Sequence, residues 1–138
     1  MTTARYKQTF SERAAEYIDS PLMLQRIKVG RTICCVIRGR YGIYQTRATL
    51  KPNRKFKDAS CTCPSEYQPC KHAVALAETF LKMPESFVDV DKLVAGLCKK
   101  SSKNLLGLIR DMITAAPASL QALGVKGFEE VREEDDYE

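Results

Sequence analysis

Residues 61–72 read CTCPSEYQPCKH, and this stretch contains four of the seven cysteine and histidine residues of the sequence. It contains three of the six cysteines and the only histidine among the 138 residues. Three thiolates and one imidazole suit a tetrahedral zinc ion, and four protein ligands leave no coordination position for a substrate. We therefore predict one structural zinc ion held by Cys61, Cys63, Cys70 and His72; the alternative is three buried thiols and a surface histidine.

The two ligand pairs require different backbone conformations. Alternate residues of a strand point the same way, so Cys61 and Cys63 can converge on one ion at the end of a strand over residues 58–63. Residues two apart on a helix point about 200° apart, so two ligands at that spacing cannot both lie within a helix. We therefore place Cys70 at the entrance of a helix and His72 in its first turn.

This helix is predicted to run from Lys71 to Met83. Pro84 would end it, because a proline disfavours helical backbone at the residue before it. Apolar residues recur at helical spacing within the segment and define one face that is expected to be buried. That inward face comprises Ala73, Val74, Ala77, Phe80 and Leu81.

The pattern C-T-C-P, a spacer that ends in Pro69, and then C-K-H-A-V-A-L resembles the core of the SWIM zinc finger. That family has C-x-C, a variable spacer and C-x-H. The resemblance covers roughly residues 26–83, and its specificity depends on residues 61–77. It implies a strand–strand–helix zinc module. SWIM modules occur in helicase-like remodelling ATPases, Mutator-type transposases, recombination-mediator complexes and some ubiquitin-ligase kinases, where they bind DNA or protein partners.

The segment before the cysteines is predicted to be β structure. The run TICCVI at 32–37 is β-branched and continuously apolar, as in a strand covered on both faces. Gly39 and Gly42 allow a hairpin turn, after which residues 43–50 return as a second strand. Residues 24–29 add a third. Cys34 and Cys35 are adjacent in this run and would point to opposite faces. They therefore cannot form a ligand pair and are interpreted as core or half-buried cysteines.

Helices are predicted at both ends of the chain. A capping box at residues 9–12 starts a helix that ends near Ile18. After Pro84, Val90 to Leu97 keep helical spacing, Ser101 or Ser102 caps a second helix, and Pro117 begins a short third one. The apolar surface of this C-terminal segment exceeds what it buries alone, so it packs within the chain or against another protein.

Together these elements predict an α+β fold. A short antiparallel β-hairpin sheet and a helix surround a structural zinc, and a C-terminal helical hairpin follows. The expected segments are an N-terminal helix at 1–21, a SWIM-like zinc module at 22–84, a helical segment at 85–127 and an acidic tail at 128–138. The tail is expected to be a disordered, solvating end; it alternatively folds over the basic surface and competes with nucleic acid.

Charge is divided unevenly along the sequence. The net charge is +5, but residues 129–138 alone carry seven acidic residues and one arginine, which leaves +11 for the rest. Residues 20–57 contain ten basic residues and no acidic one. Arginines and lysines interspersed with aromatics suit phosphate contacts and base stacking; the alternative is a solubilising surface, which normally mixes both signs of charge. The predicted nucleic-acid contacts are Arg38, Arg40, Arg47, Lys51, Arg54, Lys55, Lys57 and Lys71.

No catalytic set is evident in the sequence. A zinc hydrolase requires an open coordination site, and a zinc deaminase requires a histidine–glutamate motif that is absent. The three thiols outside residues 61–72 have no histidine to activate them once His72 binds metal. No glycine loop of the Walker type is present. We expect no enzyme activity and no small-molecule substrate.

Composition also bears on location. The sequence begins without a signal peptide and has no long apolar run, so we expect an intracellular protein with no membrane partner, in the cytoplasm or nucleoid, or in a eukaryotic nucleus. Two functions agree with these observations. The chain binds nucleic acid, with DNA favoured over RNA and little base specificity, or it is an adaptor that docks a helicase-like ATPase, recombinase or transposase through residues 90–123.

Overall fold

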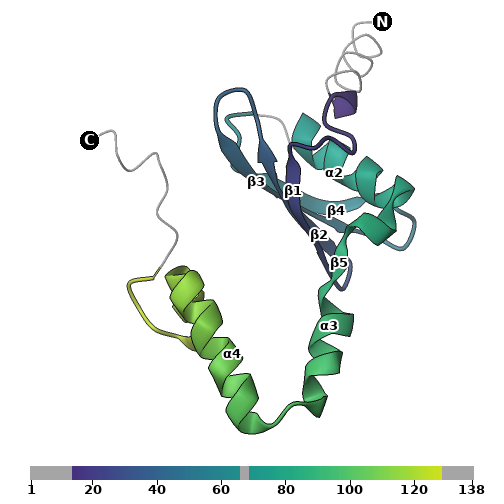
Figure 1. Cartoon of the computed structure of the whole chain (residues 1–138). Helices are drawn as coiled ribbons and strands as arrows, with labels where there is room; N and C mark the ends of the chain where they lie inside the picture. The colour runs from purple at the N-terminus through teal and green to yellow at the C-terminus, as the bar shows by residue number, and fades with distance from the viewer. Residues whose placement is uncertain (1–13, 66–68, 129–138) are drawn as a thin grey trace, which may run out of the picture. The chain divides into compact units, whose positions relative to one another are not determined.

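The computed structural model describes residues 14–65 and 69–128 (Figure 1). These residues divide into two compact units, with the boundary between Val94 and Ala95. The first unit contains a five-stranded sheet in the order β4-β3-β2-β1-β5 and the helix α2. The second unit is helical. The predicted α+β class is therefore confirmed, whereas the first half of the predicted helix at 9–18 and nearly all of the acidic tail lie outside the described residues.

Four consecutive strands form an antiparallel meander, and a short fifth strand is parallel to the first. The third strand predicted before the hairpin is present as β1. The strand that leads to the metal ligands ends at Cys61 rather than residue 63, because Cys61 still pairs with Thr46 before the chain turns. The bounds are Met23–Val29 (β1), Thr32–Arg38 (β2), Ile43–Leu50 (β3), Phe56–Cys61 (β4) and Val88–Asp89 (β5).

Helix α2 spans Lys71–Lys82, one residue shorter than predicted, and Pro84 begins the 3₁₀ turn η1 (Pro84–Ser86). Its buried face differs from the predicted one: Leu81 is exposed and Val74 is only half-buried. The helix is covered by the sheet and also by the segment before β1, because the backbone N–H of Asp19 donates to Thr79 Oγ1 at 2.9 Å. The buried residues are His72, Ala73, Ala75, Leu76, Ala77 and Thr79.

The core lies between α2 and one face of the sheet. Ile33, Cys35 and Ile37 alternate along β2 toward the helix, and Leu76 packs against them. Residues 32, 34 and 36 point to the opposite face and are half-buried. The prediction that this strand is covered on both faces is therefore wrong for the described residues; the continuous apolar run leaves a partly exposed apolar sheet face.

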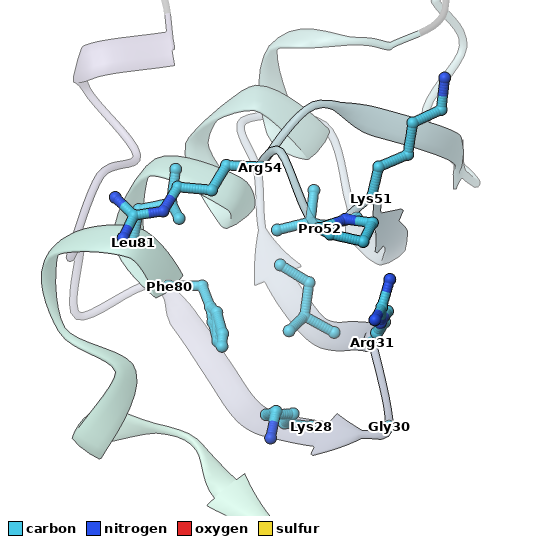
Figure 2. Close-up of a pocket in the computed structure, with 10 residues that line it drawn as sticks. Lys28, Gly30, Arg31, Lys51, Pro52, Arg54, Phe80 and Leu81 are labelled. Atoms are coloured by element: carbon cyan, nitrogen blue, oxygen red, sulfur yellow. The ribbon is translucent and has the colours of Figure 1, made fainter.

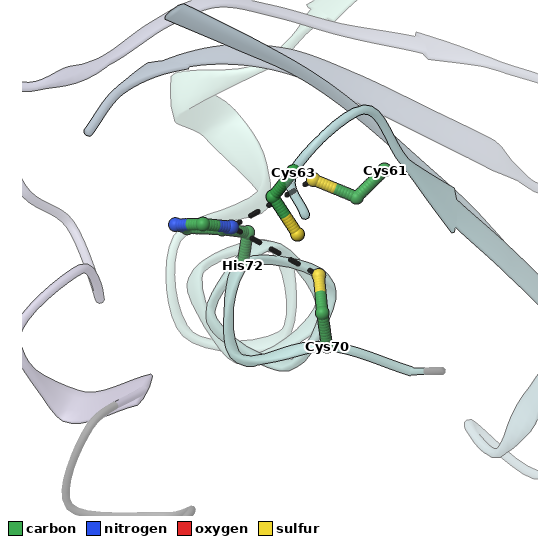
Figure 3. Close-up of side chains that lie close together, drawn as sticks. All are labelled: Cys61, Cys63, Cys70 and His72. Atoms are coloured by element: carbon green, nitrogen blue, oxygen red, sulfur yellow. Dashed lines mark hydrogen bonds between the residues drawn. The ribbon is translucent and has the colours of Figure 1, made fainter. Parts of the chain in front are cut away.

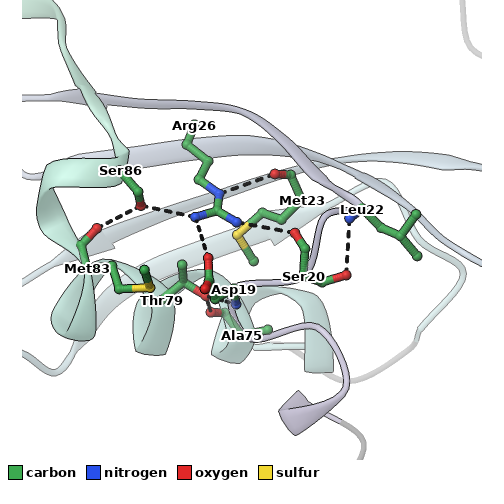
Figure 4. Close-up of polar contacts among 9 residues, drawn as sticks. All are labelled: Asp19, Ser20, Leu22, Met23, Arg26, Ala75, Thr79, Met83 and Ser86. Carbon is green, nitrogen blue, oxygen red and sulfur yellow. Dashed lines mark hydrogen bonds and ion pairs between the residues drawn. The ribbon is translucent and has the colours of Figure 1, made fainter.

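Arg26 joins three segments of the first unit (Figure 4). Its guanidinium forms an ion pair with Asp19 at 3.1 Å and donates to Ser86 Oγ at 3.0 Å. It also donates to the backbone carbonyls of Met23 and Ser20, each at 3.2 Å. Only 13% of its side chain is exposed, so the charge is compensated by acceptors from the segment before β1 and from η1.

The remaining helical elements follow β5. The predicted Ser101 cap is confirmed by the N–H of Asn104, which donates to Ser101 Oγ at 3.2 Å. The last predicted helix is a 3₁₀ turn that ends at Gly124, whose φ of 78° is left-handed. Within the described residues no helix combines the length and apolar character needed to cross a bilayer. The bounds are Val90–Gly96 (α3), Leu97–Lys99 (η2), Ser102–Ala115 (α4) and Pro117–Leu123 (η3).

Replacement of Arg26 by methionine should lower the free energy of unfolding by about 2–3 kcal/mol, because several charge-assisted hydrogen bonds are lost at once. Urea denaturation of the zinc-loaded protein measures this change. Arg31 is exposed and forms no ion pair with the described residues, so Arg31→Met serves as the control and should change stability by less than about 0.5 kcal/mol. Equal effects of the two substitutions would contradict the role assigned to Arg26.

Candidate metal centre

The four predicted ligands converge on one point (Figure 3). Cys61 is the last residue of β4, and Cys63 lies in the turn that follows. Cys70 precedes α2 in an extended conformation, with φ −76° and ψ 172°, and His72 lies in the first helical turn, as predicted. The ligand atoms all lie within 4.8 Å of one another.

The distances within this cluster agree with tetrahedral coordination of a single zinc ion. His72 Nδ1 lies 3.7 Å from Cys61 Sγ and 3.9 Å from Cys70 Sγ. A sulfur and a nitrogen bound to the same tetrahedral zinc, at about 2.3 Å and 2.0–2.1 Å, lie about 3.6 Å apart. The four side chains therefore fit one structural zinc ion, with His72 coordinating through Nδ1. Because all four ligands come from the protein, the site is closed to substrate.

The thiols of the cluster influence each other's ionisation. A hydrogen bond from Cys70, assisted by those from His72 and Thr46, holds the pKa of Cys61 well below its usual value. The same bond to Cys61 and burial raise the pKa of Cys70, and burial raises that of Cys63. Three thiolates cannot approach one another this closely without a cation. A bound zinc ion supplies that charge and favours the deprotonated form of each ligand.

Two aromatic rings enclose the histidine. Tyr17 contacts His72 edge-on with ring centroids 4.9 Å apart, and the Tyr44 ring lies at 5.2 Å. Only 3% of His72 is exposed, and its Nε2 has no hydrogen-bond partner within the described part of the chain. Metal-bound histidines usually have such a partner to orient the ring. Here the packing of Tyr17 and Tyr44 orients the ring instead.

Gly39 leaves space for one of these rings. A Cβ atom at this position would lie 2.5 Å from Cε2 of Tyr44, closer than non-bonded atoms approach. A Cβ at Gly42, in the same turn, would meet Tyr44 at 3.8 Å, an ordinary contact. The turn therefore requires a glycine at position 39 for Tyr44 to cover His72, whereas position 42 has no such steric requirement.

Sequence reasoning missed the residues around the ligands. Tyr17, Tyr44 and Thr46 contact the metal-binding side chains, and Thr46 Oγ1 lies 3.2 Å from Cys61 Sγ. The register of β3 against β4 pairs Thr46 with Cys61, but register is a long-range property that the spacing of the cysteines does not reveal. An alternation count along residues 43–50 would have placed Tyr44 and Thr46 on one face of the strand.

The other three cysteines lie outside the cluster. Cys35 is buried and Cys34 is half-buried, as expected for core thiols, and Cys98 is exposed in η2. Burial raises the pKa of Cys35 to about 12, and it also raises that of Cys34. Both are therefore protonated at neutral pH and poor nucleophiles.

The predicted basic residues fall into groups at opposite ends of the sheet. Arg38 and Arg40 lie at the β2–β3 turn, near the metal centre. There Lys71 Nζ lies over the Tyr17 ring, 5.5 Å from its centroid. Lys51, Arg54 and Lys55 lie in the β3–β4 loop, one strand length away, because the chain reverses direction between the two turns. Arg47 and Lys57 lie on the strands between them. The predicted contacts therefore do not form a single cluster.

Residues 47–80 match the family model of the SWIM zinc finger. The match begins on β3, ends in α2 and includes all four ligands. Together with the clustered side chains, it shows that this segment is a SWIM-type zinc finger, which is a binding module. No curated protein and no solved structure gives a significant match to the chain.

Replacement of Cys70 by serine should reduce the zinc content from one ion per chain to none and unfold at least the region around α2. Zinc binding contributes about 10–16 kcal/mol in small fingers, far more than a small core supplies. Metal analysis and circular dichroism measure both effects. Cys98→Ser is the matched control, since Cys98 is exposed and outside the cluster. Retention of a full zinc equivalent by Cys70→Ser would contradict the assignment.

Substitution of Gly39 by alanine should release zinc to a chelator about tenfold faster, because Tyr44 must leave His72, and loss of a group that orients a ligand typically weakens binding 10- to 100-fold. A colorimetric chelator in stopped flow follows the release. Gly42→Ala should release zinc at the wild-type rate. Equal rates for both variants would show that the Tyr44 ring does not stabilise the centre.

Proposed function

We propose that this chain, through its SWIM-type zinc finger, is a non-catalytic zinc-binding module that binds nucleic acid, with DNA favoured and little sequence specificity. The proposal depends on one observation. Of the ten basic residues in 20–57, only Arg26 and Lys28 form ion pairs within the described residues. The other eight are exposed: Arg31, Arg38, Arg40, Arg47, Lys51, Arg54, Lys55 and Lys57.

Basic side chains that lack acidic neighbours favour an anionic binding partner, rather than a role in solubility alone. A surface that serves solubility normally mixes acidic and basic residues, which limits the field of either sign. Here an acid-free segment of the sequence supplies three strands and their connecting turns. Neutralisation of phosphates by such cations releases counterions and supplies most of the affinity of non-specific nucleic-acid binding.

The distance between the basic groups suits the phosphate backbone of a nucleic acid rather than a single phosphate group. Arg38 and Lys51 lie at opposite ends of strands of seven and eight residues, which corresponds to roughly 20–25 Å at 3.3 Å per residue. That length equals roughly six or seven steps of 3.4 Å along one strand of a duplex. Contacts to phosphates position a protein without reading bases, so little sequence specificity is expected.

The zinc finger has a structural role in this proposal. The zinc ligands fix the start of α2 against the end of β4, and the buried face of α2 packs on the sheet. The helix is therefore not free to enter a groove as a recognition helix. A closed coordination sphere and the use of the only histidine as a ligand support a non-catalytic role.

A second candidate is an adaptor that docks a helicase-like ATPase, recombinase or transposase through residues 90–123. One observation favours it: α4 exposes large apolar side chains within its own unit. Leu106 and Met112 are 66% and 67% exposed, and Ile109 is 46% exposed. Apolar side chains at helical spacing on one exposed face suit burial by a partner protein. The two functions are compatible within one chain.

A salt titration tests nucleic-acid binding. The logarithm of affinity for a duplex should fall against the logarithm of salt concentration with a slope of roughly −4 to −5 if about five phosphates are contacted. Changing Arg54, Lys55 and Lys57 together to glutamate should lower affinity at least tenfold and flatten the slope. Fluorescence anisotropy with a labelled duplex measures both.

The control changes Lys99, Lys100 and Lys103 to glutamate, which alters net charge equally but outside the zinc module. It should bind nearly as well as the wild type. If no duplex or single strand binds the zinc-loaded wild type at low salt, the nucleic-acid function fails and the adaptor remains. If the two triple variants lose affinity equally, net charge rather than the position of Arg54, Lys55 and Lys57 explains the binding.

A further inference from the structure

A pocket of about 250 Å³ opens at the end of the sheet that is remote from the metal centre (Figure 2). It lies between the C-terminal half of α2, the β1–β2 turn and the β3–β4 loop. Its apolar lining is formed by Ile33, Leu50, Pro52, Phe80 and Leu81. The pocket is close to the small end of ligand sites, about 300 Å³, so its size suits one ring system rather than an extended ligand.

Positive charge surrounds this apolar space. Four of the ten lining residues are basic, namely Lys28, Arg31, Lys51 and Arg54, and none is acidic. Lys28 Nζ lies 3.8 Å from Asp89, so this charge is partly neutralised. The other three form no ion pair with any described residue. In Figure 2 Phe80 and Pro52 border the space, the charged end of Lys51 points away from it, and the side chain of Arg54 runs toward Leu81.

The loop that carries two of these cations is held in one conformation. The N–H of Lys51 donates to the carbonyl of Lys55 at 2.8 Å, and the N–H of Arg54 donates to the carbonyl of Lys51 at 2.9 Å. Asn53 Oδ1 accepts from the N–H of Lys55 at 3.1 Å. Arg54 has a φ of 68°, a left-handed conformation that is unusual for arginine. The backbone of the rim is therefore pre-organised.

We infer that this pocket receives one unstacked base of a single-stranded nucleic acid, while the phosphates on either side of that base contact Arg31, Lys51 and Arg54. The inference deepens the proposed nucleic-acid binding and depends on it. An apolar slot beside an aromatic ring suits the flat face of a base, and base–aromatic stacking tolerates every sequence. Each base is joined to phosphates on both sides, which matches cations around the rim.

A duplex cannot use the pocket in the same way, because its bases are paired and stacked, and extrusion of a base costs unstacking energy. Single strands should therefore bind more tightly than duplexes of equal charge. An acidic peptide with one apolar side chain is a different class of ligand. In such a peptide the carboxylates need not lie on both sides of the apolar side chain. The three cations around the rim therefore favour a nucleic acid over an acidic peptide.

The test compares labelled oligothymidylate with an abasic oligonucleotide of the same length, which keeps the phosphates and lacks the bases. The zinc-loaded wild type should bind the abasic strand at least fivefold more weakly. Phe80→Leu removes the aromatic wall and should reduce this difference to less than twofold. Phe56→Leu is the matched control: Phe56 is also partly buried against the core but does not line the pocket, and the fivefold difference should persist.

A second pair of variants keeps the test valid if Phe80→Leu fails to fold. Leu81 is 39% exposed on the pocket wall, and Leu24 is 41% exposed on the sheet. Leu81→Glu should weaken oligothymidylate binding at least fivefold, whereas Leu24→Glu, with the same charge change, should weaken it less than twofold. Zinc content and the urea midpoint verify that each variant is folded.

The outcomes separate this inference from the proposed function. If the wild type binds oligothymidylate and the abasic strand equally, or if Phe80→Leu leaves their difference unchanged, the pocket does not hold a base, although nucleic acid is bound. If neither single strand nor duplex binds, the proposed function itself fails. If an acidic peptide with one phenylalanine displaces the strand and binds more tightly, with loss of binding in Leu81→Glu, the pocket serves a protein ligand.

Discussion

The convergence of Cys61, Cys63, Cys70 and His72 holds the zinc module together. It joins the end of β4 to the beginning of α2 and so fixes the helix on the sheet. The helix face that meets the sheet is rich in alanine, which permits close approach but buries little apolar area per residue. Metal coordination supplies stabilisation that such a small core lacks.

Local spacing allowed the metal ligands and α2 to be predicted from sequence, because the ligands lie within twelve residues and the helix begins directly after Cys70. The strands followed from β-branched residues and glycine turns. The two-residue β5, the Arg26 contacts and the tyrosines around His72 could not be predicted. Each depends on segments that are distant in sequence, and a single side chain carries no signal of its partner.

The error over residues 32–37 and the spacing of the basic residues have the same physical origin. An apolar run such as residues 32–37 shows that both faces of a strand are apolar, but not that the chain itself covers both. The chain path also decides how the predicted basic residues are spaced. Antiparallel strands separate the β2–β3 turn from the β3–β4 loop by their whole length. Topology, rather than composition, decides both outcomes.

Helix α2 connects the two ends of the zinc module. His72 binds at its first turn, and Phe80 and Leu81 line the pocket, eight and nine residues later, or roughly 12–14 Å along the axis. Because the helix is rigid over this length, the metal determines where the pocket wall lies against Leu50 and Ile33. A zinc ion that contacts none of the residues lining the pocket therefore still influences the shape of the pocket. In this arrangement a structural metal acts on a distant part of the module through the position of one helix.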